Sequence, residues 1–344
     1  MKFYEKLNFR GDYLFLTVIF FMIGFVLITK GADIFINCTV EIGRRTNISE
    51  IVLGATIVSF ATTLPEFTVS LFASMDGHTT MSLGNAVGSI ICNTGLALGL
   101  VVLISPFKVD RNMFFHRAVL LIVSLVVFLV LGIDGEISKG DSAVLLLIFI
   151  YYMYSNYKGI KNSNESNNKE LFGRYSRHLK RSEERKYGGF HIRDIIRIGS
   201  LFIVGLIMMI IGSRLLINNG VKIATFMGIP QAIVSLTVIA LGTSLPELVS
   251  SLTAIRKNHH SISVGNIIGA NTLNLLCVIG VSAIPNSLPI LSQNRLLDFP
   301  FMILLLMILV IPTLLKHKLY RIQGIAMLGT YIIYLGTLYA MYII

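Results

Sequence analysis

The stretch that decides the fold is SFATTLPE at residues 59–66, which returns in related form as ALGTSLPE at residues 240–247. Each copy lies in the middle of a long apolar run. Proline lacks an N–H and collides with the carbonyl four residues earlier, so Pro65 frees the carbonyl of Ala61 and Pro246 frees that of Gly242. Both stretches therefore predict a helix that is interrupted inside a membrane, with the freed oxygens facing a hydrated cavity where they become ligands for a cation.

The two stretches belong to an internal repeat at an offset of 181 residues. Residues 31–99 align without a gap to residues 212–280, and 21 of these 69 positions are identical. Shared apolar residues would arise in any membrane protein, whereas polar residues, Gly and Pro matching in register would not. The informative identities are Asn37/Asn218, Thr62/Thr243, Leu64/Leu245, Pro65/Pro246, Glu66/Glu247, Ser70/Ser251, Gly84/Gly265, Asn85/Asn266, Gly88/Gly269 and Asn93/Asn274.

The composition places most of the chain in lipid. Of its 344 residues 54% are hydrophobic and only 14% are charged, whereas soluble domains carry about 25% charged residues. Ten apolar runs are long enough to cross a bilayer core of about 30 Å. Their limits are 12–36, 48–74, 80–105, 112–132, 140–157, 196–218, 229–255, 261–284, 297–315 and 323–343.

We therefore expect an all-α polytopic membrane protein with ten transmembrane helices, of which helices two and seven are broken. Residues 1–157 and 196–344 form two five-helix repeats, with the repeat motifs at 54–99 and 235–280, and the basic segment 158–195 joins them. Because five is odd, the second repeat crosses the membrane in the opposite sense to the first. Inverted repeats of this kind are the plan of secondary transporters.

The positive charges predict the orientation. With residues 158–195 in the cytoplasm, 21 of the 29 Lys and Arg lie on the cytoplasmic side, as the positive-inside rule requires. Both termini then lie outside, although the N-terminal tail is itself basic. The net charge of +11 thus reports membrane orientation, and no nucleic-acid-binding motif accompanies it. Three isolated cysteines indicate neither a disulfide framework nor a thiolate metal site.

The polar residues inside the apolar runs predict a cation site. A glutamate at the bilayer centre costs at least ~2.5 kcal/mol, so Glu66 and Glu247 require a compensating cation. Carboxylate, carbonyl and hydroxyl oxygens suit Ca²⁺, whereas zinc or copper would require His or Cys. The helices that follow add two polar stripes, Asn85, Ser89, Asn93 and Asn266, Ala270, Asn274, together with glycines that we interpret as packing devices, Gly84, Gly88, Gly265 and Gly269.

Other polar residues predict less. His78, His259 and His260 lie in short loops, where solvation is favoured over metal binding. Asp33 and Arg214 occupy equivalent repeat positions with opposite charges, which indicates either an ion pair between them or snorkelling. The basic segment 158–195 is interpreted as a topology determinant that contacts anionic headgroups.

With these motifs the chain resembles the cation/calcium exchanger superfamily, and within it the prokaryotic sodium/calcium exchangers, over nearly its whole length. The resemblance implies that spans one and six slide against the remaining bundle, and that three Na⁺ typically exchange for one Ca²⁺. It also implies a Ca²⁺ site at Glu66, Glu247, Thr62 and Thr243, with Asn93 and Asn274 beside it, and Na⁺ sites at Ser59, Thr63, Glu66, Ser89, Ala240, Thr243, Ser244 and Glu247.

Three positions depart from the pattern of that family or of its potassium-dependent branch. Ile90 replaces the Asn that usually follows the Ser at position 89. Ala270 stands where the family commonly has Ser, which would weaken one Na⁺ position. Asn274 is neutral where the potassium-dependent branch carries Asp, which argues against K⁺ cotransport.

The predicted function is Na⁺/Ca²⁺ antiport across the cell membrane, as electrogenic Ca²⁺ extrusion by a monomeric unit with no cofactor beyond the transported ions. Ca²⁺/H⁺ antiport is the alternative. A cation channel would use a symmetric pore, and no enzyme constellation occurs in a span.

Overall fold

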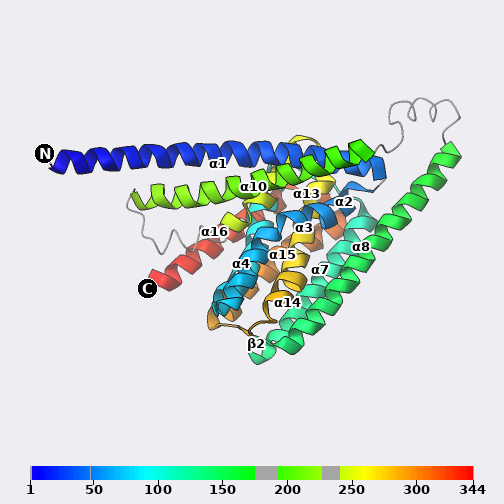
Figure 1. The fold of residues 1–344 in the computed structure, drawn as a ribbon. Coiled ribbons are helices and arrows are strands. Elements are labelled where there is room, and N and C mark those ends of the chain that lie inside the picture. The colour runs from blue at the N-terminus through cyan, green and yellow to red at the C-terminus, as the bar shows by residue number, and fades with distance from the viewer. Residues whose placement is uncertain (1, 47, 175–191, 227–240, 344) are drawn as a thin grey trace.

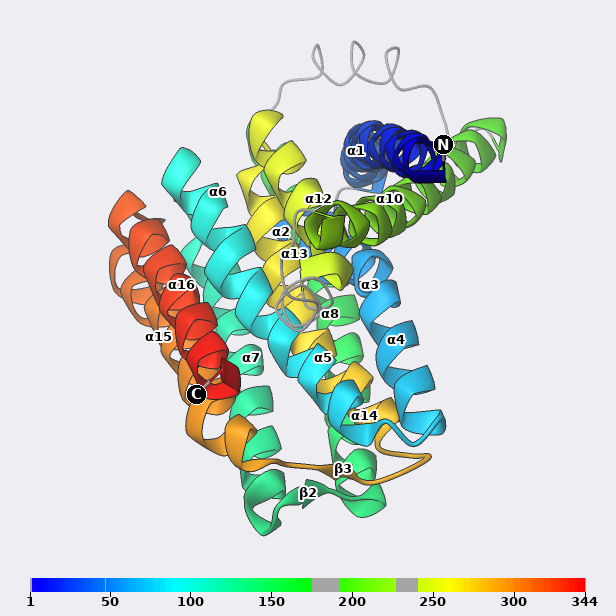
Figure 2. The same cartoon turned by 90° about the vertical axis from the view of Figure 1, so that its left-hand side faces the viewer.

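The computed structural model describes residues 2–46, 48–174, 192–226 and 241–343. Two long helices, α1 (Lys2–Thr46) and α10 (Ile192–Phe226), run side by side across a bundle made by the other helices (Figures 1 and 2). The first half of the bundle contains α2 (Glu50–Leu53), the π-helix η1 (Gly54–Val58), α3 (Ser59–Thr62), α4 (Leu64–Met75), α5 (Thr79–Cys92), the π-helix η2 (Asn93–Leu98), α6 (Gly99–Ile104), α7 (Arg111–Leu131), the short η3 (Gly132–Asp134) and α8 (Lys139–Arg174). The second half contains α12 (Leu245–Arg256), α13 (His260–Leu273), the π-helix η4 (Asn274–Val278), α14 (Ile279–Ser282), the π-helix η5 (Asn294–Asp298), α15 (Phe299–Lys316) and α16 (Arg321–Ile343).

The apolar helices establish a multi-span membrane protein. Within the described residues, seven helices are long and apolar enough to cross a membrane, and the pair Glu50–Thr62 and Leu64–Met75, bent by 44°, makes an eighth. The predicted break in the second apolar run is therefore confirmed. The seventh predicted run, 229–255, lies partly outside the described residues.

Three helices are longer than the hydropathy predicts. α1 extends beyond the expected 12–36 at both ends, α10 extends beyond the expected 196–218 at both ends, and α8 continues past residue 157 into the basic segment. Hydropathy locates the apolar part of a helix, but the helix itself ends only where the backbone is interrupted. The residues that extend these three helices include no proline, so the backbone hydrogen bonding continues.

The internal repeat is visible in the boundaries of the elements. α4 and α12 begin 181 residues apart and have the same length, and so do α5 and α13. Two short ribbons also relate the halves: β1 (Phe107–Lys108) pairs with β4 (Lys318–Leu319), and β2 (Glu136–Ile137) pairs with β3 (Leu288–Pro289). Each ribbon joins a strand of one half to a strand of the other, so the two halves interlock reciprocally.

Glycines bring α1 and α10 into direct backbone contact. A Cβ on Gly24 would lie 2.9 Å from the carbonyl oxygen of Gly212, and a Cβ on Gly31 would lie 2.8 Å from that of Gly205. Small residues allow this approach where lipid supplies no hydrophobic drive for association. At one end of the pair, Arg45 forms a 3.2 Å ion pair with Asp194. The two helices are therefore built as one unit.

α5 and α13 form the centre of the bundle (Figure 2). The spans Thr79–Ile104 and His260–Ser282, which begin with these helices, bury 72% and 89% of their most apolar stretch, against 22% for the spans in α1 and α10. Gly265 and Gly269 of α13 pack against the backbone of Gly54 and Ala55, which confirms the packing role expected of these two glycines. The same expectation is wrong for Gly84, where a Cβ would meet nothing within 4 Å. The polar stripes of α5 and α13 are consequently held in the interior, beside the breaks in the neighbouring helices.

Candidate cation-binding site

The two Leu-Pro-Glu sequences begin α4 and α12. Proline in the first turn of a helix costs little, because the N–H that it lacks has no intrahelical partner there. Glu66 and Glu247 follow in the same first turns, near the positive end of each helix dipole. Both glutamates are completely buried. In each half, therefore, the same short sequence interrupts the helix and places a buried glutamate at the interruption.

Each glutamate accepts a hydrogen bond from the opposite repeat. The hydroxyl Oγ1 of Thr63 donates to Oε1 of Glu247 at 3.1 Å, and the hydroxyl Oγ of Ser244 donates to Oε1 of Glu66 at 3.3 Å. Thr63 and Ser244 are equivalent positions of the repeat. The two breaks therefore face each other, and each orients the carboxylate of its partner.

A second reciprocal pair joins each break to the central helix of the other half. Thr62 donates through Oγ1 to Oδ1 of Asn266 at 3.2 Å, and Thr243 donates to Oδ1 of Asn85 at 3.3 Å. The amide nitrogen of Asn85 in turn donates to Ser70 at 2.9 Å. The amide nitrogen of Asn266 donates likewise to the hydroxyls of Ser250 and Ser251, at 3.1 and 3.3 Å.

This positioning role of Asn85 and Asn266 is not predicted by the sequence, which places them only on polar stripes. The available signal was the identity of Asn85/Asn266 and of Ser70/Ser251 in both repeats.

Buried polar atoms remain without partners on helices that pack together around the two breaks, because η2 packs against α12 and η4 packs against α4. Among the described residues, Oε2 of Glu66, Oε2 of Glu247 and the amide groups of Asn93 and Asn274 accept or donate no hydrogen bond. Leaving a buried polar group unpaired costs about 1–3 kcal/mol, and more when the group is charged. Asn93 and Asn274 also begin the π-helices η2 and η4, a distortion frequent at functional sites. Two carboxylate and two amide oxygens are thus available to a ligand.

The donor set selects a hard cation. No group of three or more His, Cys, Asp or Glu that could hold a metal occurs in the described part of the chain. Transition metals favour nitrogen and sulfur ligands, whereas Na⁺ and Ca²⁺ are hard cations and Ca²⁺ takes carboxylate and amide or carbonyl oxygens. The oxygens at this centre fit the second group.

The other predicted Na⁺ ligands differ in placement. Ser89 lies with its Oγ 3.4 Å from Oγ1 of Thr243, at the centre. Ser59 is buried but donates to the carbonyl of Thr56 in its own helix at 3.2 Å. Ala270 is completely buried and offers no hydroxyl to Thr62, so the Ser89–Thr243 contact has no counterpart in the other half. Ala240 lies outside the described residues.

One expectation needs correction, and one of two alternatives left open by the sequence is excluded. The carbonyl of Gly242 is not left free by Pro246, because the hydroxyl of Ser213 on α10 donates to it at 2.7 Å. Asp33 does not pair with Arg214; its carboxylate lies 3.1 Å from Nζ of Lys257. The offset alignment identifies equivalent positions, and equivalent positions of two repeats need not be in contact.

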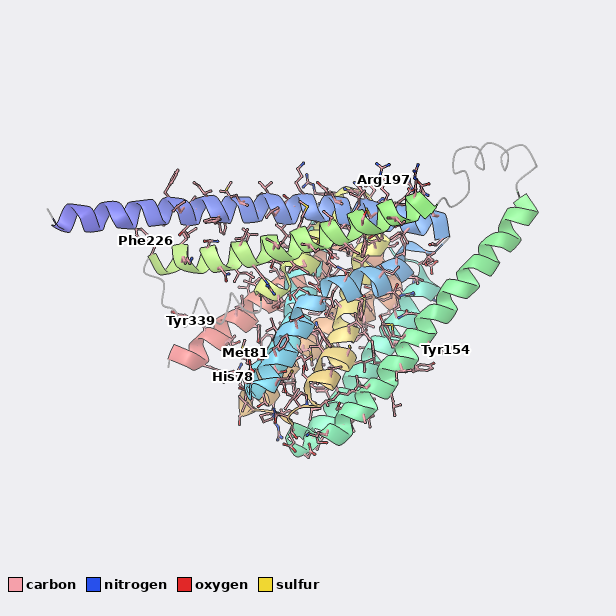
Figure 3. The ribbon with its side chains drawn as sticks, viewed as in Figure 1. His78, Met81, Tyr154, Arg197, Phe226 and Tyr339 are labelled. Carbon is pink, nitrogen blue, oxygen red and sulfur yellow. The ribbon has the colours of Figure 1, made fainter. Side chains whose placement is uncertain are left out.

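The histidines have ordinary surroundings. Nδ1 of His259 lies 2.7 Å from Oε1 of Glu50, and both side chains are partly exposed. His78 is exposed at the turn between α4 and α5 (Figure 3). These contacts leave the oxygen cluster around the two glutamates as the candidate site.

A buried set of oxygens between interrupted helices of two repeats, inside a multi-span membrane protein, defines the class of secondary transporters. The family described as "Sodium/calcium exchanger protein" matches residues 16–158 and 198–340. The chain therefore belongs to the sodium/calcium exchanger family, within the cation/calcium exchanger superfamily, and is a transporter rather than an enzyme.

Relatives and solved structures cover almost the whole chain. It is 34% identical to the uncharacterized membrane protein MJ0091 of Methanocaldococcus jannaschii, over 94% of this chain and 99% of that protein. It is 28% identical to the sodium/calcium exchanger MaX1 of Methanosarcina acetivorans, over 92% and 97% of the two chains. A solved structure of the sodium-calcium exchanger NCX_Mj superposes with a TM-score of 0.79 at 32% identity, covering 94% of this chain and 99% of that one.

Proposed function

We propose that this protein exchanges Na⁺ for Ca²⁺ and that both ions use the centre between Glu66 and Glu247. The observation that carries the proposal is the set of buried oxygens without partners on Glu66, Glu247, Asn93 and Asn274. Ca²⁺ takes 6–8 oxygen ligands, and backbone and hydroxyl oxygens around Thr62 and Thr243 supply the remainder. The name and structure of the related exchangers support the choice of ions.

Charge explains the coupling between the two ions. Without a cation the centre holds two buried carboxylates, a state that resists closure because each charge is desolvated. One Ca²⁺, or several Na⁺, neutralises the carboxylates and permits the conformational change. We assign Na⁺ to oxygens of Ser59, Thr63, Ser89 and Ser244, to the carbonyl of Ala240, and to Thr243 and both glutamates.

The transport cycle follows from the repeat. In this proposal ten spans form two inverted repeats, residues 1–157 and 196–344, around the segment 158–195. The unit formed by α1 and α10 slides across the remaining helices and exposes the centre to each side in turn. Its few buried residues and its backbone-to-backbone packing support movement as one body.

The orientation follows from charge. The start of α1 and the end of α16 lie at one side of the molecule, and the end of α8 and the start of α10 lie at the other (Figure 1). With the basic segment in the cytoplasm, both termini lie outside. If three Na⁺ enter for each Ca²⁺ expelled, one net charge crosses per cycle, worth about 2.3 kcal/mol per 100 mV of membrane potential.

Ca²⁺/H⁺ antiport is the second candidate. It is favoured by the one unpartnered oxygen that each buried glutamate presents, because that oxygen can carry a proton in place of a cation. The two kinds of coupling are distinguished by whether a Na⁺ gradient or a pH gradient drives Ca²⁺ uptake.

The test of the site is Na⁺-gradient-driven uptake of radioactive Ca²⁺ into inverted vesicles. Glu66→Gln and Glu247→Gln keep the shape of the side chain and remove its charge, so each variant is expected to lose uptake while remaining in the membrane. Uptake retained by either variant contradicts the assignment. Glu136→Gln, at an exposed ribbon position, is the matched control and should transport normally.

A further inference from the structure

Lys257, which directly follows the C-terminus of α12, binds the middle of α1. Nζ of Lys257 lies 3.1 Å from the carboxylate of Asp33, and it donates to the backbone carbonyl of Asp33 at 2.9 Å and to Oδ1 of Asn37 at 2.8 Å. The lysine side chain is 25% exposed and that of Asp33 is 49% exposed. This contact joins the unit of α1 and α10 to the broken helix that carries Glu247.

Both partners have repeat equivalents in which the charges are exchanged. At the offset of 181 residues, Asp33 corresponds to Arg214 and Lys257 corresponds to Asp76. The geometry supports the second equivalence, because Asp76 directly follows α4 and Lys257 directly follows α12. In each half the next residue has a positive φ, 82° at Gly77 and 61° at Asn258. The acidic–basic pair Asp33–Lys257 therefore corresponds to the pair Arg214–Asp76, which is also attractive but has the acidic and basic residues exchanged.

The third member of the contact also has a suitable equivalent. Asn37 corresponds to Asn218, the same residue type. An asparagine side chain carries both an acceptor and two donors. Its oxygen accepts from Lys257 in the pair seen here, and its nitrogen is able to donate to an aspartate in the equivalent position.

The second pair is not formed in this structure. Arg214 and Asp76 are both exposed, and neither takes part in an ion pair between described residues. α1 packs along α12, whereas α10 has no comparable contact with α4. The turn between α4 and α5, marked by His78, lies away from α10, whose end is marked by Phe226 (Figure 3); Figures 1 and 2 agree.

We propose that Asp33–Lys257 and Arg214–Asp76 are two alternative ion pairs, each of which holds one of the two access states. If the repeats exchange their conformations during transport, a contact between positions 33 and 257 in one state becomes a contact between 214 and 76 in the other. This inference rests on the alternating movement in the proposed function. In the orientation given above, the first pair closes the cytoplasmic side and the second closes the outer side.

The two pairs should bias the states by similar amounts in opposite directions. Partly exposed ion pairs contribute modestly, so removing one should change the ratio of the states about two- to fivefold. If these residues had only a structural role, substitutions in the first pair and in the second pair would not shift the ratio of the states in opposite directions.

The experiment measures the distance between α4 and α10 directly. Spin labels replace the exposed Met75 and Ile211 in a background that lacks the three native cysteines, and pulsed electron resonance in liposomes gives the populations of short and long distances. Asp33→Asn and Lys257→Gln are expected to raise the short-distance fraction about two- to fivefold, and Asp76→Asn and Arg214→Gln to lower it by a similar factor. Lys30→Gln, an exposed charge on α1, should leave the ratio unchanged.

The combined variants make the test decisive. Asp33→Asn with Asp76→Asn should restore the original ratio, and the exchange Asp33→Lys with Lys257→Asp should do the same. Shifts in the same direction from both ends, or no shift from either, overturn the proposal. Since the distances require neither Na⁺ coupling nor Ca²⁺ flux, failure of the proposed ion exchange leaves this result unaffected, and failure of the ion pairs leaves the flux assay unaffected.

Discussion

The crossed hydroxyl bonds predict that Thr63 and Ser244 tune Ca²⁺ binding equally, although they lie in different repeats. Thr63→Val keeps the shape of the side chain and removes the donor to Glu247, and Ser244→Ala removes the donor to Glu66. Both residues are buried, at 3% and 1% exposure, so water cannot readily replace their hydroxyls.

The magnitude follows from the distances. Hydrogen bonds from a hydroxyl to a carboxylate contribute about 1.5–3 kcal/mol when they are about 2.5–2.7 Å long. The bonds here are longer, at 3.1 and 3.3 Å. Because each hydroxyl holds a carboxylate in position for Ca²⁺, we expect each variant to lose about 1–1.5 kcal/mol of the free energy of Ca²⁺ binding. This loss weakens Ca²⁺ binding about 5- to 12-fold.

The assay is Ca²⁺ titration of the purified protein in detergent without Na⁺, with the melting temperature as the measure of folding. Thr337→Val is the matched control, because its hydroxyl bonds only within its own exposed helix turn, to Ile333 at 3.0 Å and to Tyr334. If both variants are folded and bind Ca²⁺ within twofold of the original protein, or if only one of them is affected, the reciprocal arrangement is refuted.

Asn85→Ala and Asn266→Ala each remove several buried hydrogen bonds, so each should lower the free energy of unfolding by about 1–3 kcal/mol, seen as a lower melting temperature; unchanged melting would contradict the network. Gly212→Ala should slow Ca²⁺ exchange, because its Cβ would lie 2.6 Å from the backbone nitrogen of Ile28, whereas Gly336→Ala meets nothing within 4 Å and should be silent in the same flux assay. Ala270→Ser adds a hydroxyl at the repeat equivalent of Ser89, whose own hydroxyl contacts Thr243. The Na⁺ concentration for half-maximal exchange should therefore fall, and an unchanged value would show that this position is not part of a Na⁺ site.

Much of the fold could be predicted from local chemistry. The Leu-Pro-Glu sequences specify the break by themselves, since proline cannot continue a helix, and the polar identities between the halves specify the repeat. The helix ends were less predictable, because hydropathy does not show where α1 and α8 stop inside polar sequence.

The site was predictable in its residues more than in its contacts. Glu66 and Glu247 are conspicuous as buried charges, whereas the crossing of hydrogen bonds between repeats depends on how the two breaks pack against each other. The hydrogen bond from Ser213 to the carbonyl of Gly242 could not be predicted either, because it depends on how α10 packs. The repeat gave no indication of it, since the equivalent of Ser213 is Ala32, which carries no hydroxyl. The pairing of Asp33 with Lys257 also depends on tertiary packing that periodicity does not encode.

The most direct measurement compares Ca²⁺ flux in proteoliposomes under imposed Na⁺, K⁺ or H⁺ gradients, with the membrane potential clamped. Sodium/calcium exchange at the centre between Glu66 and Glu247 predicts that an opposing Na⁺ gradient alone drives Ca²⁺ accumulation and that Glu66→Gln abolishes it. Accumulation driven by a pH gradient in sodium-free buffer would contradict sodium coupling, and accumulation that survives Glu66→Gln would contradict the site.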